Sequence, residues 1–418
     1  MRNKNTSLFA YTLSHFCVDF GCVFVLFRLF PADGAPGGQW TAFFVYCVLA
    51  FGLQAPFGDF LDKRGKEPGA LVGFLLIAFG IALCAAVGLA GGSVSVAAIG
   101  AGPGVGFGGV SPGFAWTAVC LAGLGNALFH AEGGIDCLVN AGGRMARSGV
   151  FVCSGAMGVA LGALAGQGSG MQVFGYDADA GVSALVPLAS IAVSAISLAL
   201  FKYRGREFKR GSSPAYFGTD AGGGKAARPG GGKAPRGLGA DMAGAALLLV
   251  FLAVTIRAYG GGLIQMPWKP EYMLLPAAAA CAGKAAGGFL ADRFGARGIG
   301  CIPLLACMPL FLFGYGVPAL CAAGIFLFNT VMPVTLCALS DRLRGHPGLA
   351  FGTASLALLV GSTPHYFIAM GQGAALAALP ALCAVAAIAV FAAVPGGRGA
   401  GRQRGIIKSN KEGKTGGK

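Results

Sequence analysis

The sequence predicts an all-α polytopic membrane protein with twelve transmembrane helices, arranged as two six-helix bundles. Composition, the placement of basic residues and an internal duplication carry this prediction. Hydrophobic residues make up 55% of the 418 positions, charged residues only 11%, and the mean hydropathy is +0.70. A soluble domain carries roughly a quarter charged residues. Apolar runs of about 20 residues recur along the chain, and that length crosses about 30 Å of hydrocarbon.

The basic residues follow the pattern of a membrane protein, although the formal net charge of +15 could suggest nucleic acid. All Lys and Arg residues lie in the N-terminus, in alternate loops or in the tail, except Arg28, Arg257, Lys269 and Lys284. Cytoplasmic loops of membrane proteins show this bias. We therefore expect a multi-pass protein of the inner (cell) membrane, surrounded by lipid, with both termini cytoplasmic and no nucleic-acid partner.

Six apolar segments precede a basic, Gly- and Pro-rich linker and six follow it. The predicted spans are Leu8–Phe30, Trp40–Leu61, Leu71–Ala90, Phe114–Gly133, Ser148–Gln167, Ala184–Phe201, Met242–Gly262, Tyr272–Ala291, Ile299–Val317, Leu320–Leu339, Leu349–Met370 and Ala375–Val394. The uncharged stretch Gly91–Gly113 is expected to be an external loop. The chain thus divides into an N-terminal bundle (1–201), a cytoplasmic linker (202–240), a C-terminal bundle (241–395) and a basic cytoplasmic tail (396–418).

Sequence signatures of soluble enzymes and metal sites are not found. The thirteen cysteines lie mostly inside apolar segments and show no C-x-x-C or metal-ligand spacing. There is no Walker A sequence, no G-x-S-x-G and no H-E-x-x-H. We therefore expect no cofactor, no metal and no enzymatic activity.

One short motif occurs in both halves of the chain. Gly58–Lys66 reads G-D-F-L-D-K-R-G-K, and Gly288–Arg297 reads G-F-L-A-D-R-F-G-A-R. Each copy closes one apolar segment: the glycine lets two helices approach, the aspartate ends the first helix and the basic turn faces water. We expect Asp62 to accept bonds from the N-terminus of a neighbouring helix and from nearby bases. The motif residues are Gly58, Asp62, Lys63, Gly65 and Lys66 in the first copy, and Gly288, Asp292, Arg293, Gly295 and Arg297 in the second.

The twelve spans, the central linker and the duplicated motif resemble the major facilitator superfamily of secondary transporters. The first copy matches that superfamily's loop 2–3 motif; the second matches its loop 8–9 motif, with Ala296 where a base is usual. The resemblance implies a monomer that moves a small-molecule substrate by alternating access. A membrane sensor or enzyme on the same scaffold is the alternative from another functional class.

Two further stretches resemble fosmidomycin-resistance-type exporters. They are Leu13–Asp19 in the first span and Phe129–Gly134 after the fourth, where Ala131 replaces a proline usual in those exporters. The resemblance implies export of a small molecule in exchange for protons, that is, antiport. Proton-coupled uptake by symport is the alternative.

Ionisable residues inside the spans are the first candidates for substrate and proton binding, since each costs at least about 2.5–3.5 kcal/mol in hydrocarbon. His15 and Asp19 lie four residues apart on one helical face, where imidazole and carboxylate can exchange a proton near neutral pH. A purely structural polar pair is the alternative. Arg257 and Lys284 can each meet an anionic substrate group or balance Asp19 across the cleft between the halves. Arg257 could instead extend to the outer membrane surface, whereas Lys284 lies too deep to reach the surface and is expected in the cavity.

Further candidates come from the fourth, tenth and eleventh spans. His130 and Glu132 stand at the inner end of the fourth span, where ion pairing with the arginines that follow is the first interpretation and a proton relay the second. Asn126 and Asn329 hold equivalent places in the two halves and either line a cavity or join helices. His365 follows a Ser-Thr-Pro sequence that predicts a kink in the eleventh span.

Overall fold

The structure is a computed structural model that describes residues 3–30, 38–64, 69–89, 112–167, 180–202, 216–217 and 238–396. Within these ranges every regular element is helical. Most of the expected external loop at 91–113, of the linker and of the tail lies outside the described residues, as do Gly65 and Lys66 of the first motif.

Six spans form the N-terminal half. Five are continuous helices: α1 (Lys4–Leu29), α4 (Gly69–Leu89), α5 (Pro112–Asn140), α6 (Met145–Gly166) and α8 (Ala180–Phe201). The second span consists of α2 (Gly38–Cys47), the π-helical turn η1 (Val48–Gly52) and α3 (Gln54–Arg64). The predicted spans are recovered, and α5 runs seven residues beyond its predicted end at Gly133. That extension changes where its polar residues lie.

The C-terminal half repeats the count. Its continuous helices are α9 (Leu238–Gly262), α10 (Leu275–Phe294), α11 (Ala296–Phe313) and α15 (Gln372–Ala393). The tenth span is split into α12 (Pro318–Asn329) and α13 (Met332–Arg342), because Pro333 lacks the N–H that a helix interior needs and stands in the first turn of α13. The eleventh span is α14 (Pro347–Ser362) followed by the 3₁₀ turn η4 (Thr363–Tyr366). Its predicted extension to Met370 was wrong, since the helix tightens at Pro364 and then ends.

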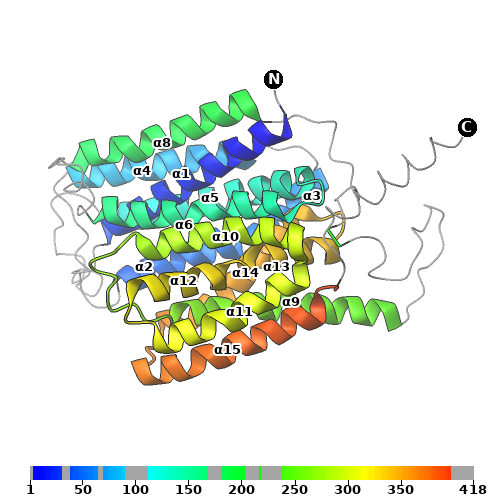
Figure 1. The fold of residues 1–418 in the computed structure, drawn as a ribbon. Helices are drawn as coiled ribbons and strands as arrows, with labels where there is room; N and C mark the ends of the chain where they lie inside the picture. The colour runs from blue at the N-terminus through cyan, green and yellow to red at the C-terminus, as the bar shows by residue number, and fades with distance from the viewer. Residues whose placement is uncertain are drawn as a thin grey trace, which may run out of the picture.

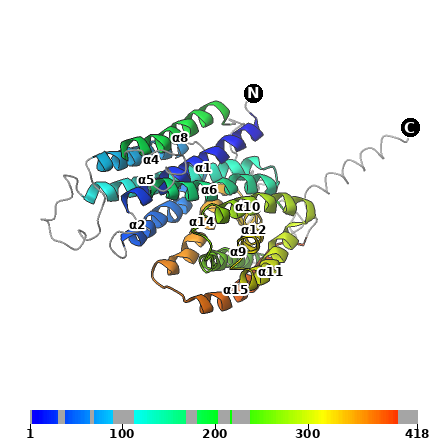
Figure 2. The same ribbon diagram turned by 60° about the vertical axis from the view of Figure 1, so that its left-hand side comes forward.

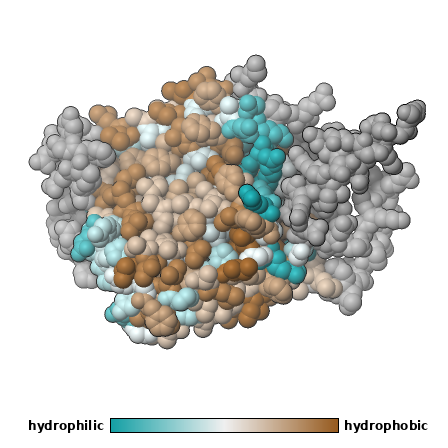
Figure 3. Space-filling view, in the orientation of Figure 1, coloured by the Kyte–Doolittle hydropathy of each residue, from teal (hydrophilic) through white to brown (hydrophobic). Residues whose placement is uncertain are grey.

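The helices suit a membrane. In the described part of the chain, ten helical segments are long and apolar enough to span one. The remaining two spans are α10, which carries Lys284, Asp292 and Arg293, and α14, which has 16 residues. Apolar residues cover the middle of the face in Figure 3, and polar residues gather toward its ends. The chain is therefore an all-α, multi-pass membrane protein.

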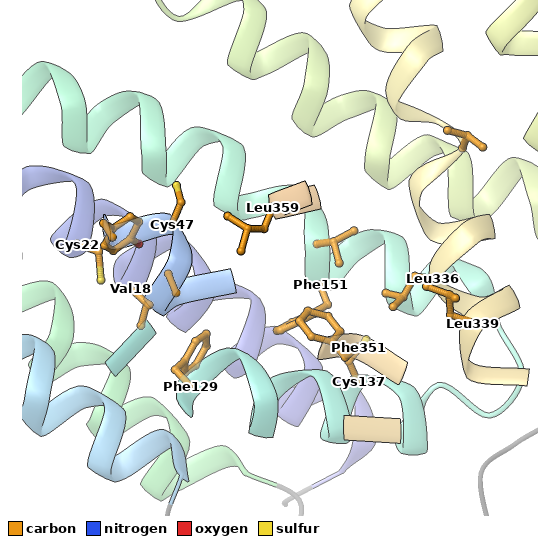
Figure 4. Close-up of a cluster of buried hydrophobic side chains, with 14 of the residues drawn as sticks. Val18, Cys22, Cys47, Phe129, Cys137, Phe151, Leu336, Leu339, Phe351 and Leu359 are labelled. Atoms are coloured by element: carbon orange, nitrogen blue, oxygen red, sulfur yellow. The ribbon is translucent and has the colours of Figure 1, made fainter. Parts of the chain in front are cut away.

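The two halves lie side by side, each with its six spans grouped together (Figures 1 and 2). We call the end at which α1 begins and α15 ends the base. The halves meet along two helix pairs, α6 with α10 and α3 with α14. These pairs are equivalent, since each joins the span that carries one motif copy to the fifth span of the other half. Between them lies a buried apolar core in which Phe151 of α6 and Phe351 of α14 are neighbours, with ring centroids 5.9 Å apart (Figure 4).

Glycines bring α6 against α1. The sequence showed a G-x-x-x-G-x-x-x-G pattern on α6, the arrangement that lets membrane helices approach closely. A Cβ on any of these glycines would overlap α1 backbone: Gly158 faces the carbonyl of Phe16, Gly162 that of Phe20, and Gly166 that of Phe24. The packing role expected from the pattern is confirmed, and it holds α6 against the face of α1 that carries His15 and Asp19.

Replacing Gly162 with Ala should destabilise the protein, because the new methyl group would overlap the Phe20 carbonyl. Overpacking of this kind costs about 1–3 kcal/mol. The control is Gly244→Ala on α9, where a Cβ meets nothing within 4 Å and the better helix former should leave stability unchanged or slightly raised. Thermal unfolding of the purified protein measures both; equal transition temperatures would contradict the packing role.

Candidate functional site

A cluster of four polar residues lies inside the N-terminal half. Asp19 and His15 come from α1, and Asn126 and His130 from α5; together we call them the polar cluster. The Asp19 carboxylate accepts a bond from Asn126 Nδ2 at 3.0 Å and lies 3.3 Å from His15 Nε2 and 3.7 Å from His130 Nε2. All but Asp19 are at least nine-tenths buried, and the Asp19 side chain is 14% exposed.

Both imidazoles are oriented by backbone carbonyls. His15 Nδ1 lies 2.8 Å from the carbonyl oxygen of Phe151, and His130 Nδ1 lies 2.9 Å from that of Asn126. A carbonyl only accepts, so each Nδ1 must carry the hydrogen. In a neutral ring the other nitrogen, Nε2, then presents a lone pair to the Asp19 carboxylate. Lone pairs facing a carboxylate repel it, so the cluster is satisfied only when it holds an additional proton.

The polar cluster is closed toward the base. The ring of Phe151 lies 5.0 Å from that of His15, and Phe351 stacks on His130 at 6.4 Å. On the α6 side, a Cβ at Gly155 would overlap both the Asp19 carboxylate and the His15 ring. The aromatic rings and the close helix approach exclude water from that side, while the partial exposure of Asp19 leaves one route to solvent.

Three members of the polar cluster also form a possible cation site. Among the described residues, His15, Asp19 and His130 are the group of metal-ligating side chains whose donor atoms lie within 4.8 Å of one another. Two imidazole nitrogens and a carboxylate can hold a transition metal as well as a proton. The sequence led us to expect no metal, because His130 was not placed beside His15.

The structure separates His130 from Glu132. Their grouping at the inner end of the fourth span was wrong, because α5 continues to Asn140 and carries His130 deep into the bundle. Glu132 is buried between helix ends: Tyr11 and Lys202 donate to its Oε1, and the backbone N–H of Ala70 donates to Oε2 at 2.9 Å. Glu132 therefore anchors the first turn of α4, and its partner is Lys202 rather than an arginine after α5.

Arg257 lines a cavity of about 420 Å³ between the two halves. It is 7% exposed, so the sequence-based alternative that it extends to the membrane surface was wrong. No described carboxylate pairs with it, and its Nε has no hydrogen-bond partner. The contact found for its guanidinium is the face of Phe328, 5.7 Å from the ring centroid. We call this space the central cavity; its other walls are mainly Phe43, Phe51, Ile325, Leu358 and Tyr366.

Of the two remaining polar candidates in the C-terminal half, Lys284 and Asn329, it is Asn329 that lines the central cavity. Lys284 is half-buried on α10 and interacts electrostatically with both Arg257 and Asp19, so it links the two halves. Asn329 lines the cavity and donates to the Ile325 carbonyl of its own helix at 2.8 Å. Asn126 instead binds Asp19, so the two asparagines that are equivalent in sequence differ in their contacts.

An aromatic contact lies at the end opposite the base. Tyr366 of η4 packs on Phe44 of α2 at 5.3 Å and shares a hydrogen bond of 3.2 Å with the Cys47 thiol. The Tyr366 side chain separates the central cavity from an outer cavity of about 390 Å³. His365 lines the outer cavity, stacks on Tyr259 at 4.8 Å and bonds its carbonyl oxygen.

The duplicated motif closes the base twice in the same way. Asp62 accepts the N–H groups of Gly348 and Leu349 at the start of α14, both at 2.9 Å. Asp292 accepts those of Met145 and Ala146 at the start of α6, at 2.8 and 3.1 Å. A carboxylate suits a helix N-terminus, where free N–H groups and the helix dipole meet it.

The motif glycines allow this approach. A Cβ at Gly58 would overlap the backbone of Gly348, and one at Gly288 would overlap that of Met145. Gly295 ends α10 with a φ of 102°, a conformation that other residues rarely adopt.

The motif bases bind elsewhere than expected. Lys63 pairs with Asp59 rather than Asp62, Arg293 lies against the ring of Phe294, and Arg297 donates to the Val394 carbonyl at 2.6 Å.

Comparisons with known proteins identify the fold. No protein-family model matches the sequence, and no curated protein matches it. Solved structures do. FucP, a major facilitator superfamily transporter in the outward conformation, matches with a TM-score of 0.57 at 16% identity, over 92% of this chain and 96% of FucP. The chain has the fold of the major facilitator superfamily.

Two further structures of that fold match over nearly their whole length. One is the E. coli fucose:proton symporter FucP, with a TM-score of 0.58, 15% identity, and 93% of this chain and 96% of that one covered. The other is the human organic anion transporter MFSD10, with a TM-score of 0.59, 14% identity, and 94% and 100% covered. Neither they nor the first structure is described as a fosmidomycin-resistance-type exporter, so that resemblance stays a prediction.

The base of this major facilitator fold is also held closed by contacts that the sequence did not predict. Asp341 of α13 accepts the N–H groups of Tyr216 and Phe217 from the linker, at 2.9 to 3.1 Å. The buried Tyr216 hydroxyl donates to the Leu138 carbonyl of α5 at 3.1 Å. The linker thus bridges the halves. No pattern in the basic, Gly-rich linker marks Tyr216, apart from its being an aromatic pair with Phe217.

Replacing Asp62 with Asn should loosen the start of α14, because a neutral amide cannot accept two charge-assisted bonds as a carboxylate does. Such bonds contribute about 1.5–3 kcal/mol each. We expect hydrogen exchange of the Gly348 and Leu349 amides, measured by mass spectrometry, to accelerate about tenfold or more. Asp292→Asn should do the same at the start of α6. Asp59→Asn, on the exposed side of α3, is the control and should leave both sites unchanged; faster exchange there as well would count against the specific contact.

Proposed function

We propose that this chain is a secondary active transporter that moves a small molecule by alternating access and is coupled to protons through the polar cluster. The observation that carries the proposal is the cluster itself: two imidazoles, each fixed by a carbonyl at Nδ1, direct Nε2 at one buried carboxylate. This arrangement brings three proton acceptors together, and α1, which carries two of them, packs on α6 at the interface between the halves. A proton bound there is shielded from the base by Phe151 and Phe351, so its release toward the base requires the helices to rearrange.

The contacts between the halves support alternating access. The base is closed by the Asp62 and Asp292 contacts, and the central cavity lies toward the opposite end, behind Tyr366. We assign the base to the cytoplasm, from the positive-inside bias of the loops. The arrangement then corresponds to an outward-facing or nearly occluded state. Transport would require the base to open by separating α3 from α14 and α6 from α10, which are related by the duplication.

The proteins of similar fold support a transport function but do not point to one particular solute. One is described as a fucose:proton symporter and another as an organic anion transporter, and both share the fold at low sequence identity. The sequence itself favoured export by proton antiport from the inner membrane, with symport as the alternative. A monomer suffices for either mechanism, because one chain contains both halves and the cavity, and no enzymatic step is required.

Proton flux into proteoliposomes tests the proposal. We suggest adding L-fucose, benzoate and fosmidomycin separately to vesicles that contain a pH indicator and the purified protein. At least one solute should cause proton movement. Asp19→Asn should reduce solute accumulation driven by a pH gradient by about tenfold or more while exchange of solute across the membrane persists, because the site would remain without its proton acceptor.

His130→Gln is a second variant, useful if Asp19→Asn does not fold. Asp59→Asn removes a carboxylate outside the polar cluster and should behave like the unmodified protein. Absence of proton flux with all three solutes, in protein that shows a normal thermal transition, would overturn the proposal. Unchanged gradient-driven accumulation in both cluster variants would remove the cluster from the coupling mechanism.

A further inference from the structure

We propose that the central cavity binds a small organic anion through Arg257, and that this anion binds together with the proton of the polar cluster, so that both move in the same direction. This inference rests on the proposed transport function and deepens it, naming a substrate class and the sense of coupling. It reverses the preference for antiport stated in the sequence analysis.

The first argument is that Arg257 lacks a protein anion. An ionised guanidinium in the membrane interior needs a partner. The buried carboxylates of the described chain have other partners: Asp19 in the polar cluster, Asp62 and Asp292 at helix N-termini, Glu132 with Lys202, and Asp341 with the linker. Arg257 is more than nine-tenths buried, lines the cavity, and leaves its Nε unbonded. A side chain so placed is arranged for an anion that comes and goes.

The shape of the cavity defines the rest of the ligand. Apart from Arg257 and the amide of Asn329, its walls are chiefly aromatic and aliphatic, with Phe43, Phe328 and Tyr366 among them. A volume of about 420 Å³ lies within the range of small-molecule sites. A guanidinium pairs best with a planar carboxylate or a tetrahedral oxyanion, to which it donates two parallel bonds. The expected ligand therefore has one anionic group on a compact apolar body.

The second argument concerns the coupling to protons. One helix connects the charges of the two halves: α6 packs on the backbone of Lys284 at Gly149 and on the side chains of Asp19 and His15 at Gly155, next to the central cavity that Arg257 lines. The cavity and the polar cluster are therefore close enough to influence each other electrostatically. A negative charge on Asp19 opposes an anion in the cavity, and a proton on the cluster removes that opposition. By reciprocity the bound anion favours the bound proton. Positive linkage of this kind is what a symporter needs, whereas an antiporter needs its two ligands to exclude each other.

Other ionisable groups face Asp19 and belong to the same balance. They are His15 and Cys22 on α1, Tyr46 on α2, His130 on α5 and Lys284 on α10. Thiol and phenol groups have ordinary pKa values well above 7 and stay neutral between pH 6 and 8, whereas a proton in the cluster is shared among Asp19, His15 and His130. Protonation at any of these residues makes the cluster more positive and therefore favours binding of an anion in the central cavity.

Binding measured on the purified full chain tests both parts. The probes are benzoate, phenylphosphonate and the neutral benzamide, which has the shape of benzoate without its charge. Ligand-induced shifts of the thermal transition should show binding of at least one anion and none of benzamide. Arg257→Gln should weaken anion binding by about tenfold or more. Lys269→Gln, which removes an exposed cation outside the cavity, is the matched control and should bind as the unmodified protein does.

The proton linkage is read from the same samples. Benzoate is ionised at both pH 6 and pH 8, since a carboxyl group has an ordinary pKa of about 4. Its binding should be tighter at pH 6, by up to about tenfold per pH unit for one linked proton, and should take up protons from a weakly buffered solution. The Asp19→Asn variant should lose this pH dependence while still binding benzoate.

Several results would overturn the inference. Benzamide binding as well as benzoate, unchanged binding by Arg257→Gln, or no binding of either anion would remove the anion site. Tighter binding at pH 8, or proton release on binding, would reverse the coupling to antiport. These outcomes concern binding alone, so they leave proton-coupled transport of another solute intact and are distinguishable from its failure.

Discussion

The arrangement of the two halves depends on a carboxylate held at the N-terminus of a helix in the opposite half. Asp62 binds the start of α14 and Asp292 binds the start of α6, each through two backbone N–H groups. The first N–H groups of a helix have no partner within the helix, and its N-terminus carries a partial positive charge. Leaving these N–H groups unbonded in hydrocarbon or in a dry interface would cost free energy, and each aspartate removes that cost. The glycine four residues before each aspartate brings the backbones close enough for these bonds. One repeated motif therefore accounts both for closure at the base and for the close contacts of α3 with α14 and of α6 with α10.

The same close packing positions the polar cluster. The α6 glycines hold this helix on α1, and Gly155 presses directly on His15 and Asp19. Three residues past the fixed first turn of α6, Gly149 likewise lies on the backbone of Lys284. One helix thus contacts the polar cluster at one point and the backbone of Lys284 in the other half at another. A rearrangement that frees the start of α6 from Asp292 would move both contacts together, which gives a physical route from the state of the base to the affinity of the cluster.

Hydrophobic length and the repeated motif were sufficient to predict twelve helical spans, two halves and the capping role of Asp62, because each depends on local chemistry. The pairing of His15 with Asp19 was predictable from their spacing on one helix. His130 was misplaced because the end of α5 could not be read from an apolar count: Glu132 and Asp136 lower the hydropathy, yet Glu132 is buried, Asp136 is half-buried, and both have partners on other helices. The burial of Arg257 and the pairing of Glu132 with Lys202 could not be read from the sequence either, since a cation's environment is set by tertiary packing. The only local signal for Tyr216 was the aromatic pair that it forms with Phe217 in a basic, Gly-rich linker.

The strength of the base contacts also constrains the opposite end. Four charge-assisted bonds, each contributing about 1.5–3 kcal/mol net, would hold the base closed too firmly for rapid cycling if nothing replaced them. Water can replace part of the lost bond energy when the base opens, because Asp62 and Asp292 would then be solvated. The rest of the stabilisation of the open base must come from contacts that form at the end opposite the base. Tyr366 and Phe44 already touch there, and Cys47 binds the Tyr366 hydroxyl, so the halves need only tighten an existing aromatic contact. An anion on Arg257 would add to this closure, since it removes the cost of the unpaired guanidinium while the cavity shuts around it.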